Sequence, residues 1–159
     1  MFLAFVAFVA MEPITYLTHR FVMHGLGQRL HLSHHRVVKR RRLEANDCFP
    51  VAFAASVCTG LFFGFNHETL RPLVSVGFGV TAYGLAYALV HDVYIHRRLP
   101  VTLPEMAHLK RLGDAHELHH RFNGEPYGML WPVVPRRVRE QAARHQDNGS
   151  APSQVPDQA

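Results

Sequence analysis

Three long apolar segments, separated by polar ones, dominate the hydrophobic pattern of this 159-residue chain. Residues 1–18 are apolar apart from Glu12 and a few hydroxyl side chains, and residues 49–65 and 73–90 carry no charged side chain. Each segment is close to the roughly 17–25 residues that a helix needs to cross the hydrocarbon core of a bilayer. The sequence therefore predicts an all-α integral membrane protein with three transmembrane helices.

The first and third apolar segments contain residues that predict how they pack. No basic residue precedes Arg20, so the first segment lacks the start of a cleaved signal peptide, and we expect it to be retained. Glu12 is costly in lipid, and its side chain should therefore face the protein interior. Small residues in the third segment, such as Gly77 and Gly79, favour close helix packing in a membrane.

A shorter apolar segment, residues 126–135, contains three prolines and is too short to cross a bilayer. It is predicted to be a short interfacial or re-entrant segment, with Tyr127 and Trp131 at the level of the lipid headgroups. Beyond Arg139 the chain is rich in Gln, Ala, Asp, Ser and Pro, which predicts disorder. The expected division is a membrane domain at 1–139 and a disordered C-terminal tail at 140–159.

The distribution of basic residues predicts an orientation in the membrane. Of the 17 Lys and Arg residues, only Arg71 lies in the turn between the second and third apolar segments. Three transmembrane helices place the other basic residues together on the opposite side, which the positive-inside rule assigns to the cytoplasm. The N-terminus is then outside. The basic run within residues 36–47 is predicted to be a solvated loop, and no nucleic-acid partner is expected because the run lacks interleaved aromatic residues.

Cysteine usage excludes two classes of structural site. The chain has only two cysteines, Cys48 and Cys58, so neither a disulfide framework nor a paired Cys-x-x-Cys zinc site is available. Both lie at or inside an apolar segment and are predicted to be buried thiols.

Ten of the 13 histidines fall into four short patterns, or histidine boxes, that occur in the same order twice. The first pattern is His-x4-His and the second is His-x-x-His-His. All four boxes lie on the predicted cytoplasmic side, beside the ends of the apolar segments. The boxes are His19/His24, His31/His34/His35, His91/His96 and His116/His119/His120.

Helical geometry predicts how the rings of each box are arranged. Residues at i, i+3 and i+4 share one side of a helix, so the three rings of a His-x-x-His-His box are expected to point the same way. Residues at i and i+5 lie about 140° apart at 3.6 residues per turn. Either the helix is distorted at the His-x4-His boxes, or the two rings face different directions or different metals. Histidines outside the boxes are expected to be surface or packing residues: His67, His108 and His145.

Ten clustered imidazoles indicate a metal centre, because neutral imidazole is the commonest metal ligand in proteins. They exceed the four ligands of one structural zinc site and suit two metals with five nitrogens each. Imidazole binds zinc, copper, iron or nickel, so the spacing does not choose the metal. A pair of non-haem irons would activate dioxygen to oxidise a C–H bond of a lipid-soluble substrate. A metal-transport or metal-storage membrane protein is the alternative, although a transporter would carry its ligands nearer the bilayer midplane.

The four boxes and the sequence between them resemble the bacterial non-haem di-iron β-carotene 3-hydroxylases of the fatty acid hydroxylase superfamily. The resemblance extends over about residues 8–125 and implies a bacterial cytoplasmic membrane protein that hydroxylates β-ionone rings at C3, giving β-cryptoxanthin and then zeaxanthin. Two iron ions, dioxygen as co-substrate and a ferredoxin-type electron donor are implied with it. The shared segments include Met23-His24-Gly25, His31-Leu32-Ser33-His34-His35, Glu44-Ala45-Asn46-Asp47, Thr81-Ala82-Tyr83-Gly84-Leu85 and Leu109-Lys110-Arg111-Leu112.

The sequence departs from the family pattern after His91-Asp92 and after the last box, which leaves the same chemistry on a sterol or fatty acyl lipid as an alternative. No catalytic residue is expected beyond the metal centre. Asp47 and Asp92 are candidates to orient histidine ring N–H groups, with helix capping or an ion pair as the alternative role. Tyr83 and Tyr87 are candidates to line a substrate channel, with packing as the alternative.

Overall fold

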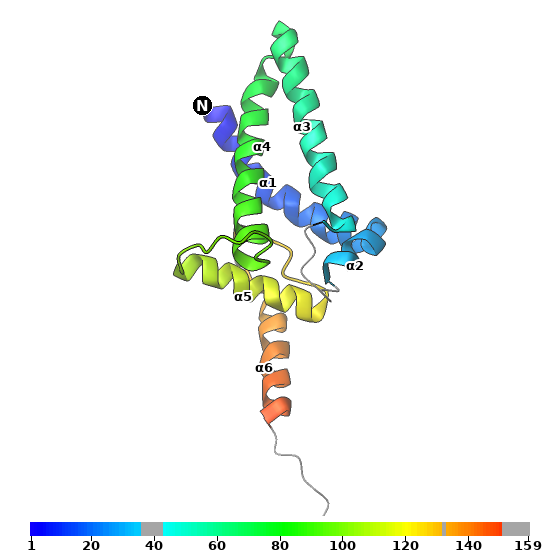
Figure 1. Ribbon diagram of the computed structural model, residues 1–159, viewed down its shortest axis with the longest axis vertical. Coiled ribbons are helices and arrows are strands. Elements are labelled where there is room, and N and C mark those ends of the chain that lie inside the picture. The colour runs from blue at the N-terminus through cyan, green and yellow to red at the C-terminus, as the bar shows by residue number, and fades with distance from the viewer. Residues whose placement is uncertain (36–42, 132, 151–159) are drawn as a thin grey trace, which may run out of the picture.

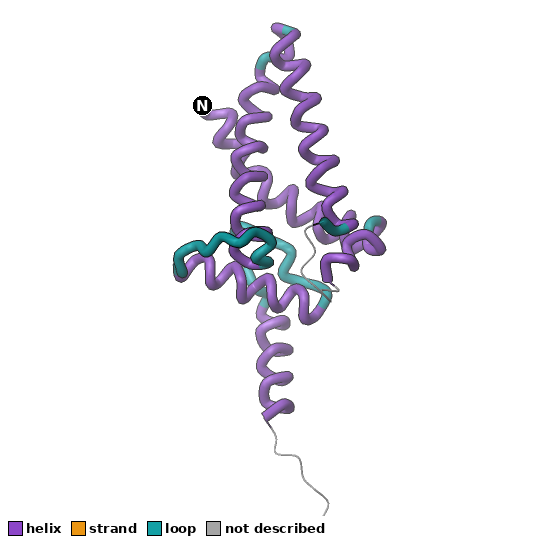
Figure 2. The backbone as a smooth tube through the Cα atoms, in the orientation of Figure 1, coloured by secondary structure: helices purple, strands orange, loops and turns teal. Residues whose placement is uncertain are grey.

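The computed structural model describes residues 1–35, 43–131 and 133–150, and all regular structure in these ranges is helical (Figure 2). Six α-helices are joined by π-helical segments (η1, η4), short 3₁₀ turns (η2, η3) and loops. In chain order they are α1 Phe2–Leu17, η1 Thr18–Leu26, α2 Gln28–His35, η2 Ala45–Asp47, α3 Cys48–Asn66, η3 Glu68–Leu70, α4 Pro72–Ala88, η4 Leu89–Ile95, α5 Ala107–Phe122 and α6 Arg136–Ser150.

Three continuous helical stretches are long and apolar enough to cross a membrane, which confirms the three predicted spans. They cover Phe2–Leu26, Ala45–Asn66 and Pro72–Ile95. Their large side chains point mostly away from the protein: Phe62 is 62% exposed and Phe78 is 58% exposed. An apolar outer surface is what a lipid environment requires, and it identifies this chain as a membrane protein.

Helix α4 is the centre of the membrane part and packs against both α1 and α3 (Figure 1). The contacts depend on glycine, as predicted for Gly77 and Gly79. A Cβ atom at Gly79 would lie 2.1 Å from the carbonyl oxygen of Ala4 in α1. One at Gly77 would lie 2.5 Å from the side chain of Leu61 in α3. The backbone of Ala4 excludes a side chain at Gly79, and a side chain at Gly77 would require Leu61 to shift.

The prediction that Cys48 and Cys58 are buried thiols is wrong. Both are free and exposed on α3. The reason is that a single membrane helix contacts its protein neighbours along only part of its surface. An apolar sequence in such a helix therefore places most side chains toward lipid rather than in a protein core.

Helix α5 lies across the ends of the membrane helices, and α6 extends away from them (Figure 1). Residues up to Ser150 are helical, and the predicted division into a membrane domain and a disordered tail at residue 139 stays a prediction. The first turn of α6 is stabilised by an ion pair between Arg136 and Glu140 at 2.7 Å, and Val138 is buried. Residues 151–159, and residues 36–42 of the predicted basic loop, lie outside the described residues.

Candidate metal centre

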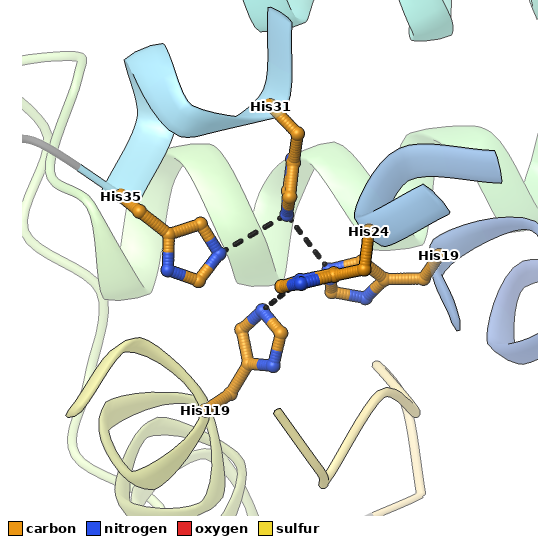
Figure 3. A group of neighbouring side chains, drawn as sticks. All are labelled: His19, His24, His31, His35 and His119. Atoms are coloured by element: carbon orange, nitrogen blue, oxygen red, sulfur yellow. Dashed lines mark hydrogen bonds between the residues drawn. The ribbon is translucent and has the colours of Figure 1, made fainter. Parts of the chain in front are cut away.

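The ten box histidines converge on the space between η1, α2, η4 and α5, where they form two adjoining groups. Ring nitrogens of the first histidine group all lie within 4.8 Å of one another, and the same holds for the second histidine group. His91 adjoins the second group, with its Nε2 atom 3.1 Å from that of His34. The first group is His19, His24, His31, His35 and His119 (Figure 3), and the second is His34, His96, His116 and His120.

Two π-helical segments bring the His-x4-His pairs together. In a π-helix the backbone hydrogen bonds run from residue i to residue i+5, so residues five apart fall on one face. In η4 the N–H of His96 donates to the carbonyl of His91 at 2.9 Å, and in η1 the N–H of Gly27 donates to Val22 at 2.7 Å. Of the two arrangements left open by the sequence, the structure has the distorted helix.

The His-x-x-His-His boxes do not point all three rings one way, so that expectation is wrong. Successive residues turn by about 100° around a helix, which puts positions i+3 and i+4 on opposite flanks of position i. His31 and His35 point into the first group, whereas His34 points into the second. His119 crosses in the opposite direction, from α5 into the first group. Each group therefore combines histidines from both halves of the chain.

Five of the box histidines use their Nδ1 atoms to bind oxygen acceptors. Carboxyl oxygens accept from two of the rings, an amide oxygen from the third, and backbone carbonyls from the other two. A carbonyl or ionised carboxyl oxygen only accepts, so the proton of each of these rings lies on Nδ1. The pairs are His34 with Glu44 at 3.0 Å, His91 with Asp92 at 3.0 Å, His31 with Asn46 at 2.7 Å, His19 with Tyr127 O at 3.1 Å, and His119 with Gly124 O at 2.5 Å.

This tautomer assignment leaves bare Nε2 lone pairs facing one another. The Nε2 atoms of His34 and His91 are 3.1 Å apart, and those of His19 and His31 are also 3.1 Å apart (Figure 3). A neutral ring that carries its proton on Nδ1 has none to share at Nε2, so two such rings cannot hold each other by a hydrogen bond at that atom. A cation between the nitrogens satisfies them, and the residues present therefore fit a bound metal.

Burial favours the neutral form of His34, His35, His96 and His120, and neutral imidazole is the form that binds metal. Desolvation, with a smaller contribution from neighbouring histidines, lowers the pKa of His96 to about 2 and that of His35 to about 3. The same causes lower the pKa of His120 to about 4 and that of His34 still further. Protons therefore compete weakly with a metal at these nitrogens.

The segment around residues 124–131 is a loop that closes the first histidine group, and Glu12 of α1 holds it. The carboxyl oxygens of Glu12 accept the backbone N–H groups of Met129 at 2.9 Å, Leu130 at 3.1 Å and Trp131 at 3.1 Å. They also accept the hydroxyl of Tyr83 at 2.6 Å. Glu12 therefore faces the protein interior, as predicted.

Tyr127 lies against the first histidine group, and its predicted place at the level of the headgroups stays a prediction. Its ring packs edge-on against those of His19, His24 and His119, with centroids 5.4, 5.1 and 5.5 Å apart. Its carbonyl accepts from His19 because the loop is pulled against α1 by Glu12. Trp131 is 68% exposed.

The two candidate aspartates have different neighbours. Asp92 accepts from His91, as expected of a residue that orients a ligand ring. Asp47 contacts no box histidine in the described part of the chain; it accepts from the N–H of Glu44 at 2.9 Å and from Arg98 at 2.7 Å. The alternative role of cap and ion-pair partner therefore describes Asp47. Arg98 also binds Asp92 at 3.2 Å and so ties the two aspartates together.

The two candidate channel tyrosines both line a cavity of about 700 Å³ beside the metal centre. The ring of Tyr87 stacks on that of His91, with centroids 5.0 Å apart. Tyr83 is almost fully buried, and its hydroxyl donates a hydrogen bond to the carboxyl group of Glu12. The three histidines outside the boxes are exposed and belong to neither group: His67, His108 and His145.

The sequence did not reveal Glu44 and Asn46 as acceptors for histidine rings, although both belong to the segment Glu44-Ala45-Asn46-Asp47. Three of its four residues are polar and lie in one short turn, and only the fold shows which of them contact a histidine. The sequence also did not reveal the two backbone acceptors, Gly124 and Tyr127. No side-chain pattern marks a backbone carbonyl as an acceptor, so the sequence carries no signal for these two contacts.

Comparisons with known proteins find a family and several named relatives that this chain resembles. Residues 4–137 match the model of a family described as fatty acid hydroxylase. The chain is 37% identical over 153 residues to a β-carotene hydroxylase of Pantoea ananas, covering 93% of this chain and 85% of that protein. It is 38% identical over 149 residues to a β-carotene hydroxylase of Pseudescherichia vulneris, covering 91% of this chain and 82% of that protein.

A plant relative is similar over a smaller share of its own length. The chloroplastic β-carotene hydroxylase 1 of Capsicum annuum is 39% identical over 143 residues, which cover 87% of this chain and 44% of the plant protein. No solved structure matches the chain.

Proposed function

This chain belongs to the fatty acid hydroxylase family, and from that membership and the histidine geometry we propose that it hydroxylates the β-ionone rings of carotenoids at C3. The products are β-cryptoxanthin after one turnover of β-carotene and zeaxanthin after the second. The choice of substrate rests on the bacterial relatives, whose names state β-carotene hydroxylase and whose similarity covers most of both chains.

The observation that carries the metal assignment is the convergence of ring nitrogens, which lie within 4.8 Å of one another in each of the two histidine groups. In the proposal each histidine group, with His91 completing the second, offers five nitrogens to one iron. Bound iron supplies the activation of dioxygen. The residues of the chain hold the ring tautomers through Glu44, Asn46, Asp92 and two backbone carbonyls, and they keep water from the ring nitrogens by burial.

The overall reaction fixes the co-substrates of the proposal. One oxygen atom of dioxygen enters the C3–H bond as a hydroxyl group, and the other leaves as water. The balance needs two electrons and two protons, and a ferredoxin-type protein is the proposed source of the electrons. The histidine groups are proposed to face the cytoplasm, where such a donor would reach them, because 16 of the 17 Lys and Arg residues lie on that side of the three spans.

Product analysis in a bacterial host that accumulates β-carotene tests the proposed function. Expression of this chain should convert β-carotene to β-cryptoxanthin and zeaxanthin. The His119→Ala variant should abolish conversion because it removes a nitrogen from the first group, whereas His108→Ala should not, because His108 is exposed outside both groups. Unchanged β-carotene in membranes that contain the iron-loaded chain, or hydroxylation of a fatty acyl or sterol lipid instead, would contradict it.

A further inference from the structure

Helices α3 and α4 touch at one end and diverge toward the other (Figure 1). Near the η3 turn, a Cβ atom at Gly64 would lie 2.9 Å from the side chain of Val74. Farther along, one at Gly77 would lie 2.5 Å from Leu61. Gly84 follows Gly77 by two helical turns on the same face of α4, yet a Cβ atom there meets nothing within 4 Å.

The divergence leaves the cavity of about 700 Å³ between the parts of α3 and α4 nearest the metal centre, with α1 as its third wall. Its volume lies within the ~300–1,000 Å³ usual for ligand pockets. Apolar residues of the three membrane helices form most of its lining. They include Met11, Phe49, Phe53, Val57, Val80 and Leu85.

The two ends of the cavity differ in character. Its inner end is lined by His91, Asp92 and Arg98, and the Nε2 atom of His91 is 3.1 Å from that of His34 in the second histidine group. Between α3 and α4 the cavity opens toward the lipid-facing surface of the membrane helices. Two of its lining residues there, Leu85 and Phe53, are 68% and 39% exposed. A molecule dissolved in the bilayer therefore has a lateral path to the histidines.

Packing does not account for the glycine at position 84. Glycine is among the least favourable residues in a helix interior. At Gly77 and Gly79 the neighbouring helix excludes a side chain, but at Gly84 no neighbour does. What a side chain there would occupy is the cavity itself, since Gly84 is one of its lining residues.

We propose that this cavity binds an isoprenoid hydrocarbon that enters sideways from the bilayer between α3 and α4, and that Gly84 keeps the entrance wide enough for its cyclic end group. The assignment rests on the proposed function, which supplies the substrate class. The polar inner end places the end group beside His91, and the apolar walls hold the chain that follows it. Gly84 is thus a specificity-determining residue that acts by its lack of a side chain.

A pair of matched glycine variants tests the proposal. Gly84→Phe narrows the cavity, whereas Gly60→Phe adds the same side chain to α3 at a position where a Cβ atom also meets nothing within 4 Å but which does not line the cavity. Each chain is purified with its metal in lipid nanodiscs containing β-carotene. The measurements are iron per chain, thermal unfolding, β-carotene bound per chain and hydroxylated product.

Gly84→Phe should retain iron and the unfolding temperature but lose at least 10-fold in bound β-carotene and in product, while Gly60→Phe behaves as the wild type. Gly84→Ala and Gly84→Leu should give a graded decline, which keeps the test decisive if the phenylalanine variant does not fold. Wild-type binding and turnover in all folded Gly84 variants would overturn the role of the cavity and leave the proposed function standing. A wild-type chain that neither binds nor hydroxylates β-carotene would instead overturn the proposed function.

Discussion

His34 and His91 illustrate how single side chains prepare the metal centre. Each donates a hydrogen bond from Nδ1 to a carboxyl oxygen, Glu44 for one ring and Asp92 for the other, and so points its Nε2 atom toward the other ring. His31 is prepared in the same way by the amide of Asn46. An acceptor that fixes the tautomer of a ligand histidine typically contributes 10–100-fold to metal affinity or activity.

Replacing Asn46 with leucine should therefore weaken the first histidine group. Asn46→Leu keeps a side chain of similar size but removes the acceptor of the His31 proton, and we expect roughly a 10–100-fold loss of iron affinity or hydroxylation rate. The control is Asn66→Leu, because Asn66 is exposed and its side-chain amide donates to the carbonyl of Phe62 in its own helix. Iron retention is measured against a chelator. Equal retention by the two variants would contradict the role given to Asn46.

Much of the residue-level picture is visible in the sequence, because the chemistry of a histidine centre repeats. The ten box histidines and Asp92 were predicted from their spacing and position. Asp47 was a candidate for the same role as Asp92, but its carboxyl group is taken by Arg98, which is distant in the sequence. A pairing over about fifty residues is set by the fold and leaves no local pattern.

The helices and π-helical segments position these histidines. At this scale the sequence left alternatives open that the structure decides. The His-x4-His spacing required either a distorted helix or rings that face apart, and η1 and η4 are the distortion. His34 of α2 joins the second group and His119 of α5 joins the first, and this follows from the position of α5 relative to α2. That position depends on packing among several elements, so box spacing does not predict it.

The loop around residues 124–131 should detach if its anchor on α1 is removed. Glu12→Gln leaves a side chain of the same size but turns one acceptor oxygen into an N–H₂ group that faces backbone donors. We expect a loss of about 1.5–3 kcal/mol in the free energy of unfolding, the usual contribution of a hydrogen bond to a charged group. The amount of iron bound by the first histidine group should also decrease, because His19 and His119 donate hydrogen bonds to carbonyls of this loop.

Thermal unfolding and iron content measure the effect of Glu12→Gln. The matched control is Glu68→Gln in the exposed η3 turn, at the opposite end of α3 from the metal centre. A Glu12→Gln protein with the iron content and stability of the control would show that the loop holds its position without the carboxyl group.

At the scale of the whole molecule, the sequence predicted the three spans and the histidine cluster at their ends, because both follow from segregated composition. It did not predict the cavity, since the divergence of α3 from α4 depends on where glycines bring the helices together. The exposed cysteines follow from the same arrangement, in which few residues of each span have a protein neighbour.

The orientation of the molecule in the membrane is predicted from its charge asymmetry and is open to labelling. In a chain whose two native cysteines are replaced by serine, Thr69→Cys in η3 should react with a membrane-impermeant maleimide in intact cells, because its turn is expected outside. Gln141→Cys in α6 should react only after the membrane is opened. The reverse pattern would place the histidine groups outside and exclude a cytoplasmic electron donor.

The most direct test of the two-metal centre is the iron content of the purified wild-type chain, measured by elemental analysis alongside chain concentration. Two groups of converging imidazoles, with His91 completing the second, predict about two irons per chain, five nitrogens for each. About one metal ion per chain, or tightly held zinc with hydroxylation that does not depend on iron, would contradict this account.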